Sequence, residues 1–534
     1  MRIRSFIIAL ACVPTLGAAQ GTMPAGTPRF NVSFGGSAHA APITGRVYVA
    51  LSRTNDARHT PIDQTGEDGV PLFGVDVSNL KPGQPVAIDA STFGYPVRSL
   101  ADIPAGTYWA QAFVNVYTEF HRADGHTVWM HMDQWEGQNW KRSPGNLFGE
   151  PVKIAFDPKS NTPIALVADQ VIPPIVEPTD DQYVKHLKIR SEILTRWWGH
   201  PMYLGATVLL PKGYDTHPNV KYPIVYDEGH FSLRPPGGGA TTAWLADSTP
   251  RVILVTLQHP SPFYDDSYDV NSANEGPYDD AIMQELIPAV ERRFRVIGQP
   301  WARLLTGGST GGWISLAQQV FHPDFYGGTW SLCPDAVDFR YHQIVNIYAD
   351  SNAYWVNHGW MTVERPDVRR PDGNVETMMK DENWYERAVG DHSRSGGQWD
   401  IWEAAYGPVG ADGYPQRIWD KRTGVIDHQV ADYWKQHFDL RYRLETNWAT
   451  LGPKLADKIN VYVGDADTYY LNDAVHLLDD FLRRTRSPRW TSEIVFQPGA
   501  PHCWGPPLPA LLQKMAAHME RTAPAGADTR SWRY

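Results

Sequence analysis

The chain of 534 residues lacks several features that would point to particular classes of protein. Basic residues are not in excess: the chain has 48 Lys and Arg and 59 Asp and Glu, which gives a formal net charge of -11. This charge argues against nucleic acids and anionic membranes as partners, since both recruit positively charged surfaces. Beyond the N-terminus no run approaches the roughly 18 consecutive apolar residues of a membrane-spanning helix. Internal repeats and low-complexity tracts are also missing.

The one strongly apolar stretch opens the chain, in the sequence MRIRSFIIALACVPTLGAAQ. Two arginines precede a mostly apolar run over residues 5–16, and small residues follow at positions 17–19. This is the pattern of a signal peptide. We therefore expect residues 1–19 to be removed and the mature protein to be periplasmic or secreted. A short membrane anchor is the alternative, although the run is too short to cross a bilayer.

Residues 28–170 have the character of β structure. Short runs rich in Val, Tyr and Trp are bounded by turn-forming residues: GRVYVALS (45–52), GTYWAQAFVNV (106–116), HTVWMHM (126–132) and PVKIAFD (151–157). Several such runs predict an N-terminal all-β sandwich domain of the Ig-like type. The proline-rich residues 171–184 are expected to form a linker.

From residue 185 to about residue 525, expected strands alternate with expected helices. The strands are GATVLLP (205–211), YPIVYD (222–227), RVILVTL (251–257), ARLLTG (302–307), GGTWSLC (327–333) and KINVYVG (458–464). The helices are DDAIMQELIPAVERRF (279–294), GWISLAQQVF (312–321) and LNDAVHLLDDFLRRT (471–485). Apolar strands separated by helices predict an α/β fold with a mostly parallel sheet covered on both faces.

Residues 340–450 interrupt this alternation. The segment is rich in Trp, Tyr, Arg and Asp and holds helical pieces such as HQVADYWKQHFDLRYRLE (428–445). We expect a helical insertion that caps the C-terminal edge of the sheet. Its aromatic residues would suit aromatic acyl groups or sugar rings, or they simply pack its core; they include Trp355, Trp360, Trp384, Trp399, Trp402 and Trp434.

The sequence GGSTG at residues 307–311 fits the pattern G-x-S-x-G. An expected strand precedes it and an expected helix follows it, so the glycines would allow a sharp turn that exposes Ser309 as a nucleophile. The Thr310 N–H then lies at a helix N-terminus, where it can stabilise developing negative charge. A glycine-rich helix entry without catalysis is the alternative. A phosphate loop is disfavoured because no Lys occupies the G-K-[ST] position.

A serine nucleophile needs a base, and three histidines follow the strand at 458–464. His476 and His518 lie within expected helices, whereas His502 lies in the loop QPGAPHCWGPP. A loop gives an imidazole access to a serine on another loop, so His502 is the expected base, and an ordinary turn residue is the alternative.

The acid that orients this base is expected at the end of the preceding strand, in GDAD. Asp467 is favoured and Asp465 is the alternative acid. A calcium loop is disfavoured, because the glycine and glutamate of that motif do not follow at the required spacing.

A second oxyanion donor is expected after the strand YPIVYD, where the backbone N–H of His230 is the best candidate. His200, His230 and His259 match no metal-ligand spacing. The site therefore predicts neither a metal nor a cofactor.

These segments together resemble the esterase D branch of the α/β-hydrolases, which includes enterochelin esterases, feruloyl esterases, S-formylglutathione hydrolases and mycolyltransferases. The resemblance covers about residues 185–520 and rests on KYPIVYDEGHF, YDDAIMQELIPAVERRF, LLTGGSTGGWISLAQQVFHPDFYGG, VYVGDADTYYLNDA and PGAPHCWG, in the family's order. It implies a triad of Ser309, Asp467 and His502, with oxyanion N–H groups at Thr310 and His230. The chain departs from the family at Glu228, where many members have Asp or His, and in the length of the 340–450 insertion.

The leading hypothesis is thus a serine esterase that acts on a small-molecule or carbohydrate-linked ester. An acyltransferase, a prolyl-oligopeptidase-type peptidase and a non-catalytic carbohydrate-binding protein are the alternatives. The repeated blades of propeller-bearing peptidases are missing here. The oligomeric state and the role of the N-terminal domain stay open.

Cysteine is scarce, with 3 copies, and Cys12 falls within the expected signal peptide. Cys333 ends an expected strand and Cys503 adjoins His502, so both should lie near the same edge of the sheet. In an oxidising compartment they would form a disulfide that ties down the His502 loop.

Overall fold

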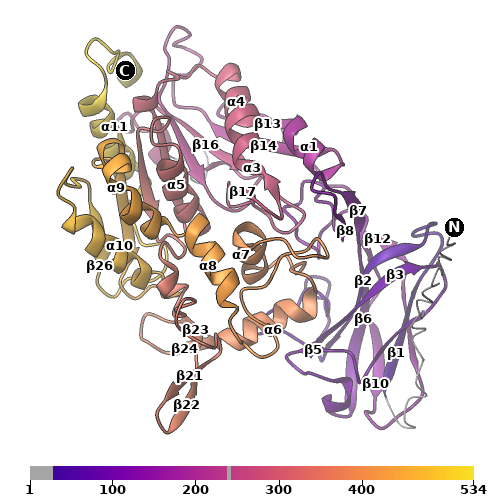
Figure 1. Ribbon diagram of the computed structural model, residues 1–534. Coiled ribbons are helices and arrows are strands. Elements are labelled where there is room, and N and C mark those ends of the chain that lie inside the picture. The colour runs from indigo at the N-terminus through magenta and orange to yellow at the C-terminus, as the bar shows by residue number, and fades with distance from the viewer. Residues whose placement is uncertain (1–27, 237–241) are drawn as a thin grey trace, which may run out of the picture.

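The computed structural model describes residues 28–236 and 242–534. The expected signal peptide, residues 1–19, lies outside the described residues. An N-terminal part made of strands lies beside a larger part in which helices flank a sheet (Figure 1). None of the described helices is long and apolar enough to cross a membrane.

The N-terminal part holds two main sheets, in the orders β11-β1-β4 and β12-β9-β6-β2-β3-β5 with β10 on β6. Their strands are β1 (Arg29–Phe34), β2 (Ile43–Ser52), β3 (Leu72–Leu80), β4 (Val86–Asp89), β5 (Gly94–Tyr95), β6 (Gly106–Val116), β9 (Leu147–Phe148), β10 (Val152–Phe156), β11 (Ile164–Ala168) and β12 (Gln170–Val171). A separate hairpin pairs β7 (Thr118–His121) with β8 (Thr127–Met130). Phe30 and Val32 of one sheet share a hydrophobic cluster with Val47 and Val49 of the other. The apolar sides of the two sheets therefore form one core.

An eight-stranded sheet forms the centre of the larger part, in the order β13-β14-β16-β15-β19-β20-β25-β26. Its strands are β13 (Val184–Ser191), β14 (Met202–Leu209), β15 (Ile224–Glu228), β16 (Ile253–Gln258), β19 (Arg303–Gly308), β20 (Gly328–Leu332), β25 (Ile459–Gly464) and β26 (Ile494–Gln497). The β13–β14 and β14–β16 pairs are antiparallel, and the pairs from β16 through β26 are parallel. Parallel strands end at the same edge, so the loops after β15, β19, β20, β25 and β26 meet there.

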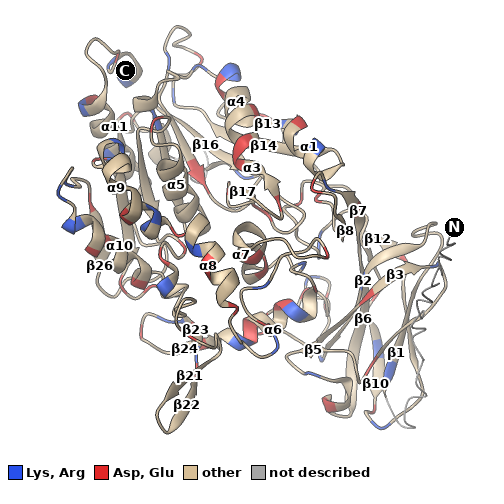
Figure 2. Ribbon diagram, in the orientation of Figure 1, with Lys and Arg blue, Asp and Glu red and all other residues tan. Residues whose placement is uncertain are grey.

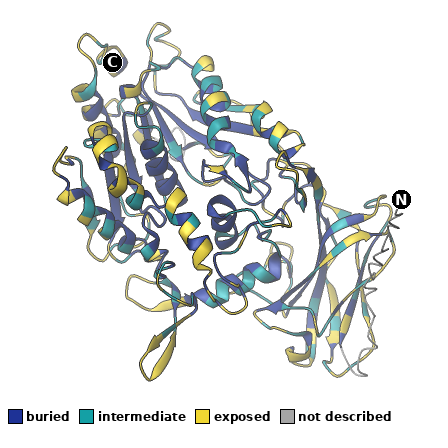
Figure 3. Cartoon of the chain, in the orientation of Figure 1, coloured by how far each residue is buried: buried dark blue, intermediate teal, exposed yellow. Residues whose placement is uncertain are grey.

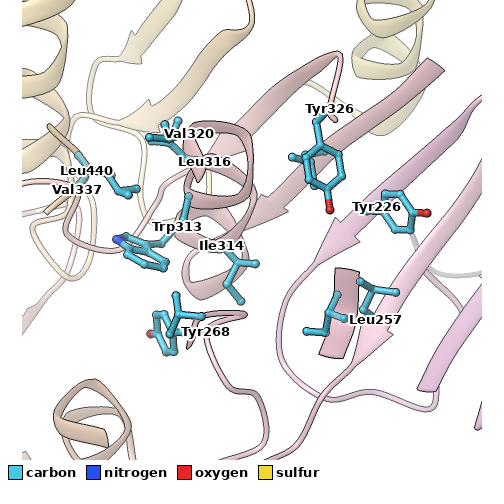
Figure 4. Close-up of a cluster of buried hydrophobic side chains, with 14 of the residues drawn as sticks. Tyr226, Leu257, Tyr268, Trp313, Ile314, Leu316, Val320, Tyr326, Val337 and Leu440 are labelled. Atoms are coloured by element: carbon cyan, nitrogen blue, oxygen red, sulfur yellow. The ribbon is translucent and has the colours of Figure 1, made fainter. Parts of the chain in front are cut away.

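The helices of this part are α1 (Glu192–Trp198), α2 (Thr242–Leu245), α3 (Tyr278–Ala281), α4 (Ile287–Arg293), α5 (Thr310–Phe321), α10 (Asn472–Arg484) and α11 (Leu508–Thr522). Helix α5 is buried along nearly its whole length (Figure 3). Figure 4 shows Trp313 and Ile314 of α5 within the apolar cluster, and Trp313 contacts the ring of Tyr268 edge-on at 5.6 Å between centroids. Helix α5 is therefore packed into the core of the larger part.

The single helix expected over 279–294 is divided. A π-helical turn, Ile282–Leu286, separates α3 from α4, and Pro288 follows at the start of α4. Proline has no N–H to donate and crowds the preceding turn, so the regular hydrogen-bond ladder changes there.

The insertion lies between β20 and β25. It contains the hairpins β21 (Trp355–His358)–β22 (Met361–Glu364) and β23 (Pro366–Arg369)–β24 (Val375–Met378), and the helices α6 (Met379–Val389), α7 (Gln398–Tyr406), α8 (His428–His437) and α9 (Leu440–Leu455). The helix expected over 428–445 is two helices, because the Asp439 side chain accepts a hydrogen bond from the Tyr442 N–H at 2.7 Å and starts α9.

The insertion also contacts the N-terminal part (Figure 1). The Tyr48 hydroxyl donates to the carbonyl of Val389 at 2.5 Å, and Arg46 Nη2 donates to the carbonyl of Ala388 at 3.0 Å. Arg394 forms an ion pair with Asp76 at 2.5 Å. The N-terminal sheets therefore support the C-terminal end of α6.

Candidate active site

Ser309 lies on a strained turn between β19 and α5. Its φ is 59° and its ψ is -122°, a conformation that residues with a side chain rarely adopt. A Cβ on Gly307 would lie 2.4 Å from the Gly311 carbonyl oxygen, and a Cβ on Gly311 would lie 1.9 Å from the Glu228 carbonyl oxygen. The glycines are thus required by close backbone contacts, and the turn presents Ser309 at the edge of the sheet.

His502 and Asp467 are in direct contact, although 35 residues separate them. The distance from His502 Nδ1 to Asp467 Oδ2 is 2.8 Å, and the Asp467 side chain is fully buried. Asp467 Oδ1 accepts hydrogen bonds from the N–H groups of Tyr469 at 2.9 Å and Leu471 at 3.3 Å. These donors fix the carboxylate, so the imidazole is held in one orientation.

The other candidate side chains lie elsewhere. Asp465 Oδ1 is 3.0 Å from His476 Nε2, and both side chains are about half exposed. His518 Nε2 lies 2.9 Å from the Gly327 carbonyl oxygen and is buried. Of the candidates named in the sequence, the structure brings Asp467 and not Asp465 to His502.

Ser309 and His502 line one cavity of about 310 Å³. Its other lining residues are His230, Asp335, Gln343, Glu382, Gln398, Trp402, Tyr469 and Leu471. The Ser309 hydroxyl donates to Asp335 Oδ1 at 3.4 Å. Loops that follow β15, β19, β20, β25 and β26 therefore supply side chains to a single small cavity, with α6 and α7 of the insertion as further walls.

Asp335 is the residue beside Ser309 that the sequence reasoning did not identify. It is buried, and its Oδ2 accepts from the Tyr268 hydroxyl at 2.5 Å and from Thr310 Oγ1 at 3.2 Å. Burial raises the pKa of this carboxyl, against the hydrogen bond from Tyr268. One signal pointed to it: Asp335 closely follows a strand that neighbours the one carrying Ser309.

Thr310 and His230, the expected oxyanion positions, both lie near Ser309. Thr310 is the first residue of α5, and His230 lines the cavity. The His230 ring, which had no expected role, is paired: Nδ1 lies 3.1 Å from Asp265 Oδ1 and 3.3 Å from Asp266 Oδ2. Burial lowers the pKa of His230, but hydrogen bonds to these two carboxylates outweigh it and raise the pKa to about 11.

Among the described residues, two groups of side chains are close enough to share a metal ion: His230 with Asp265 and Asp266, and His502 with Cys333 and Cys503. In the first, the imidazole nitrogen already bonds a carboxylate. In the second, no thiolate is available because the cysteines are joined. In the first group the side chains thus bond one another, and in the second group the two sulfurs are joined to each other.

The disulfide expected between Cys333 and Cys503 is present, with the two Cα atoms 4.8 Å apart. The Ser309 N–H lies 3.2 Å from Cys333 Sγ, and Cys503 Sγ lies 3.4 Å from His502 Nε2. The disulfide therefore touches the backbone of the elbow and the ring of the expected base.

Most tryptophans of the insertion are not in the cavity. Trp399 and Trp434 are buried in the core, whereas Trp355 and Trp360 are exposed on the β21–β22 hairpin. Of the six named in the sequence, Trp402 lines the cavity. Trp399 and Trp434 thus follow the alternative expectation, packing in the core of the insertion.

Comparison with known proteins gives a family for this region. Residues 202–404 match the family model described as "Putative esterase". No curated protein matches the sequence.

Solved structures give similar but distant matches. A ferulic acid esterase is 15% identical over 63% of this chain and 98% of that chain, with a TM-score of 0.35. An S-formylglutathione hydrolase from Staphylococcus aureus is 13% identical over 63% of this chain and 98% of that chain, with a TM-score of 0.37. An S-formylglutathione hydrolase from Agrobacterium tumefaciens is 13% identical over 65% of this chain and 98% of that chain, with a TM-score of 0.34.

The larger part of the chain thus combines a mostly parallel sheet with a segment, residues 202–404, that is similar to an esterase family. More narrowly, the match to this family supports an enzyme that hydrolyses carboxylic esters.

Proposed function

We propose that the protein hydrolyses carboxylic esters through an acyl-enzyme on Ser309, with His502 as the base and Asp467 as the acid. The contact of 2.8 Å between His502 and a fully buried, doubly hydrogen-bonded Asp467, at the cavity that Ser309 lines, carries this proposal. Asp467 holds the imidazole with its Nδ1 protonated, which leaves Nε2 free to accept the serine proton.

We assign each step to a group that lines the cavity or lies next to Ser309. His502 Nε2 takes the proton of Ser309 Oγ as this oxygen attacks the ester carbonyl. The N–H groups of Thr310 and His230 stabilise the oxyanion. Collapse of the tetrahedral intermediate releases the alcohol, which takes the proton from His502. A water molecule, deprotonated by His502, then releases the acid and restores Ser309.

During this cycle the hydrogen bond from the Ser309 hydroxyl to Asp335 must be replaced by one to His502. The Ser309 hydroxyl bonds Asp335 at 3.4 Å, a long hydrogen bond, and rotation about the Cα–Cβ bond redirects it to His502. Catalytic hydrogen bonds commonly tighten only when substrate is bound.

Labelling with a fluorophosphonate tests the nucleophile. We expect the wild type to be labelled once and to hydrolyse short 4-nitrophenyl esters, whereas Ser309→Ala loses both properties. Ser91→Ala, which removes an exposed hydroxyl of the N-terminal part, is the matched control and should behave as the wild type. Labelling that persists in folded Ser309→Ala would refute the assignment, and absence of labelling in the wild type would favour a non-catalytic binding protein.

An acyl-enzyme on Ser309 is an intermediate in ester hydrolysis, in acyl transfer and in peptide cleavage. Assays with different substrates distinguish these three reactions. Transfer of the acyl group to added sugar or lipid acceptors, in preference to water, would indicate an acyltransferase. Cleavage of peptide amides but not esters would indicate a prolyl-oligopeptidase-type peptidase. We propose that the ester hydrolase acts in the periplasm or outside the cell, on the basis of residues 1–19, and that the N-terminal sheets form an Ig-like domain that supports the insertion.

A further inference from the structure

The loop that follows β8 lies beside the active site, although it belongs to the N-terminal part. The hairpin β7–β8 lies where the two parts of the chain meet, and Figure 2 marks acidic residues at this junction. Trp135 of the loop is 5% exposed, and its ring lies edge-on to the ring of Phe231, with 5.2 Å between the centroids. Phe231 directly follows His230, the expected oxyanion donor. The N-terminal part therefore contacts the segment that carries this donor.

The backbone of the loop also lies against Phe231. A Cβ on Gly137 would lie 2.7 Å from Phe231 Cδ1, so a side chain at this position would collide with the ring. The next residue of the segment, Ser232, is bonded to the sheet, because its carbonyl accepts a hydrogen bond from Gln258 Nε2 at 2.7 Å. The segment after β15 is thus held by the loop at Phe231 and by the sheet at Ser232.

The same loop contacts the segment that holds the His230 ring. Gln138 Nε2 donates a hydrogen bond to the Pro262 carbonyl at 2.5 Å. Three and four residues further along the chain, Asp265 and Asp266 pair with His230 Nδ1 at 3.1 and 3.3 Å. Gln138 and Asp265 also line one cavity of about 320 Å³. One loop therefore touches both segments that determine where His230 lies.

The turn in this loop is held in one conformation. It contains three residues with positive φ, Trp135 at 79°, Gly137 at 73° and Gln138 at 51°, and residues with a side chain rarely adopt such values. The buried carboxyl of Asp133 accepts hydrogen bonds from the N–H groups of Trp135 at 2.8 Å and Gln138 at 2.7 Å. These bonds offset the strain of the turn, so the Trp135 ring and the Gln138 amide are presented in fixed directions.

We propose that Trp135 and Gln138 are positioning residues for the oxyanion donor His230, so that the N-terminal part completes the catalytic site. This inference rests on the proposed esterase function. Trp135 acts through Phe231 and Gln138 acts through the segment 262–266, and neither touches the reacting atoms. A backbone N–H stabilises the oxyanion only when it points at the place that this oxygen takes in the transition state, and removing one such donor costs about 10²- to 10³-fold in kcat. Displacing the donor should cost less, about tenfold.

Substitutions in the loop test the inference. We expect Trp135→Leu to lower kcat and kcat/KM equally, by about tenfold or more, because the contact that is lost acts only in the transition state. Trp135→Phe keeps an aromatic ring against Phe231 and should recover kcat to within about threefold of the wild type. Gln138→Met keeps the length of the side chain but removes the donor to Pro262, so it should lower kcat in the same way.

Trp140 gives a matched control in the same loop. It is 9% exposed, and its ring packs against Tyr48 at 4.8 Å and Phe113 at 5.1 Å between centroids, both in the N-terminal sheets. Trp140→Leu therefore removes a ring that is buried to a similar extent but does not pack on Phe231. We expect it to lower the melting temperature, as Trp135→Leu does, and to leave kcat within about twofold of the wild type. Thermal unfolding shows which variants are folded.

A pair of ketones separates a displaced oxyanion donor from a general change of the cavity. When 1,1,1-trifluoro-4-phenylbutan-2-one adds to Ser309, a bond forms from Oγ to the carbonyl carbon, the carbonyl oxygen becomes an oxyanion, and His502 takes the serine proton. The unfluorinated 4-phenylbutan-2-one binds without this step. In Trp135→Leu the inhibition constant of the trifluoro ketone should rise about tenfold or more, whereas that of the plain ketone should stay within about twofold.

Three results would overturn the positioning role. The first is a kcat within about twofold of the wild type in folded Trp135→Leu or, if that variant does not fold, in Gln138→Met. The second is an equal loss of kcat in Trp140→Leu, and the third is an equal weakening of both ketones. Failure of the esterase function has a different signature, because the wild type would then hydrolyse no 4-nitrophenyl ester and would not react with a fluorophosphonate, and both proposals would be wrong.

Discussion

Replacing Asp467 by Asn tests the acid assignment most sharply, because the structure offers a matched control. Asp467→Asn keeps the size of a fully buried side chain and removes its charge. Asp465→Asn makes the same chemical change two residues away, on a side chain that contacts the exposed ring of His476. Both residues lie in the same loop, so general damage to the loop affects both variants.

The expected loss follows from the hydrogen bonds of Asp467. It accepts from His502 Nδ1 at 2.8 Å and from the N–H groups of Tyr469 and Leu471. The side chain of Asn has one oxygen that accepts hydrogen bonds and one NH₂ group that donates them, so it cannot accept from His502 and from the two backbone N–H groups at the same time. If its NH₂ faces His502, the imidazole must protonate at Nε2 and cannot take the serine proton; if its oxygen faces His502, the NH₂ opposes two backbone donors.

We therefore expect kcat of Asp467→Asn to fall by roughly 10³ to 10⁴, which corresponds to about 4–5 kcal/mol of transition-state stabilisation. Asp465→Asn should stay within about twofold of the wild type. Steady-state hydrolysis of a 4-nitrophenyl ester measures both, and thermal unfolding checks that each variant is folded. A large loss in Asp465→Asn, or full activity in folded Asp467→Asn, would refute the reasoning.

Three further predictions concern the framework of the site. Gly311→Ala places a Cβ 1.9 Å from the Glu228 carbonyl oxygen, so we expect a loss of about 2 kcal/mol or more in unfolding free energy together with lower kcat; an unchanged melting temperature would argue against the close packing. Cys503→Ser, or reduction of its bond to Cys333, should lower kcat about tenfold or more, because both sulfurs contact the site; full activity with two free thiols would contradict this. Burial lowers the pKa of His342 to about 3, so between pH 6.5 and 3 the unfolded chain binds a proton that the folded chain does not. Relative to His342→Phe, the wild type should lose about 1.4 kcal/mol of stability per pH unit below 6.5, whereas parallel stability curves from urea unfolding would contradict the assignment.

The contact between His502 and Asp467 was predictable because local sequence patterns indicated the turn and the loops that form the site. Glycines around Ser309, between an apolar strand and a helix, can form few structures other than a sharp turn. The loops with Asp467 and His502 follow later strands of the same parallel sheet, and such strands end at one edge. The chain order therefore indicated which side chains meet, and it favoured Asp467 over Asp465 as the partner of His502.

Other parts of the cavity depend on tertiary packing, which leaves no local pattern. Asp335 is one of many acids that follow a strand, and only its position beside Ser309 distinguishes it. Glu382 and Gln343 reach the cavity because the insertion folds back over the edge of the sheet and rests on the N-terminal sheets. Trp399 and Trp402 lie on one helix, yet only Trp402 lines the cavity.

Trapping the acyl-enzyme tests the central claim most directly. The wild type is mixed with a 4-nitrophenyl ester, quenched in acid within the first turnover, digested and analysed by mass spectrometry. We predict that the peptide containing Ser309 gains the mass of the acyl group in step with a stoichiometric burst of 4-nitrophenol. An acyl group on another residue, or a burst without acylation of this peptide, would contradict the account.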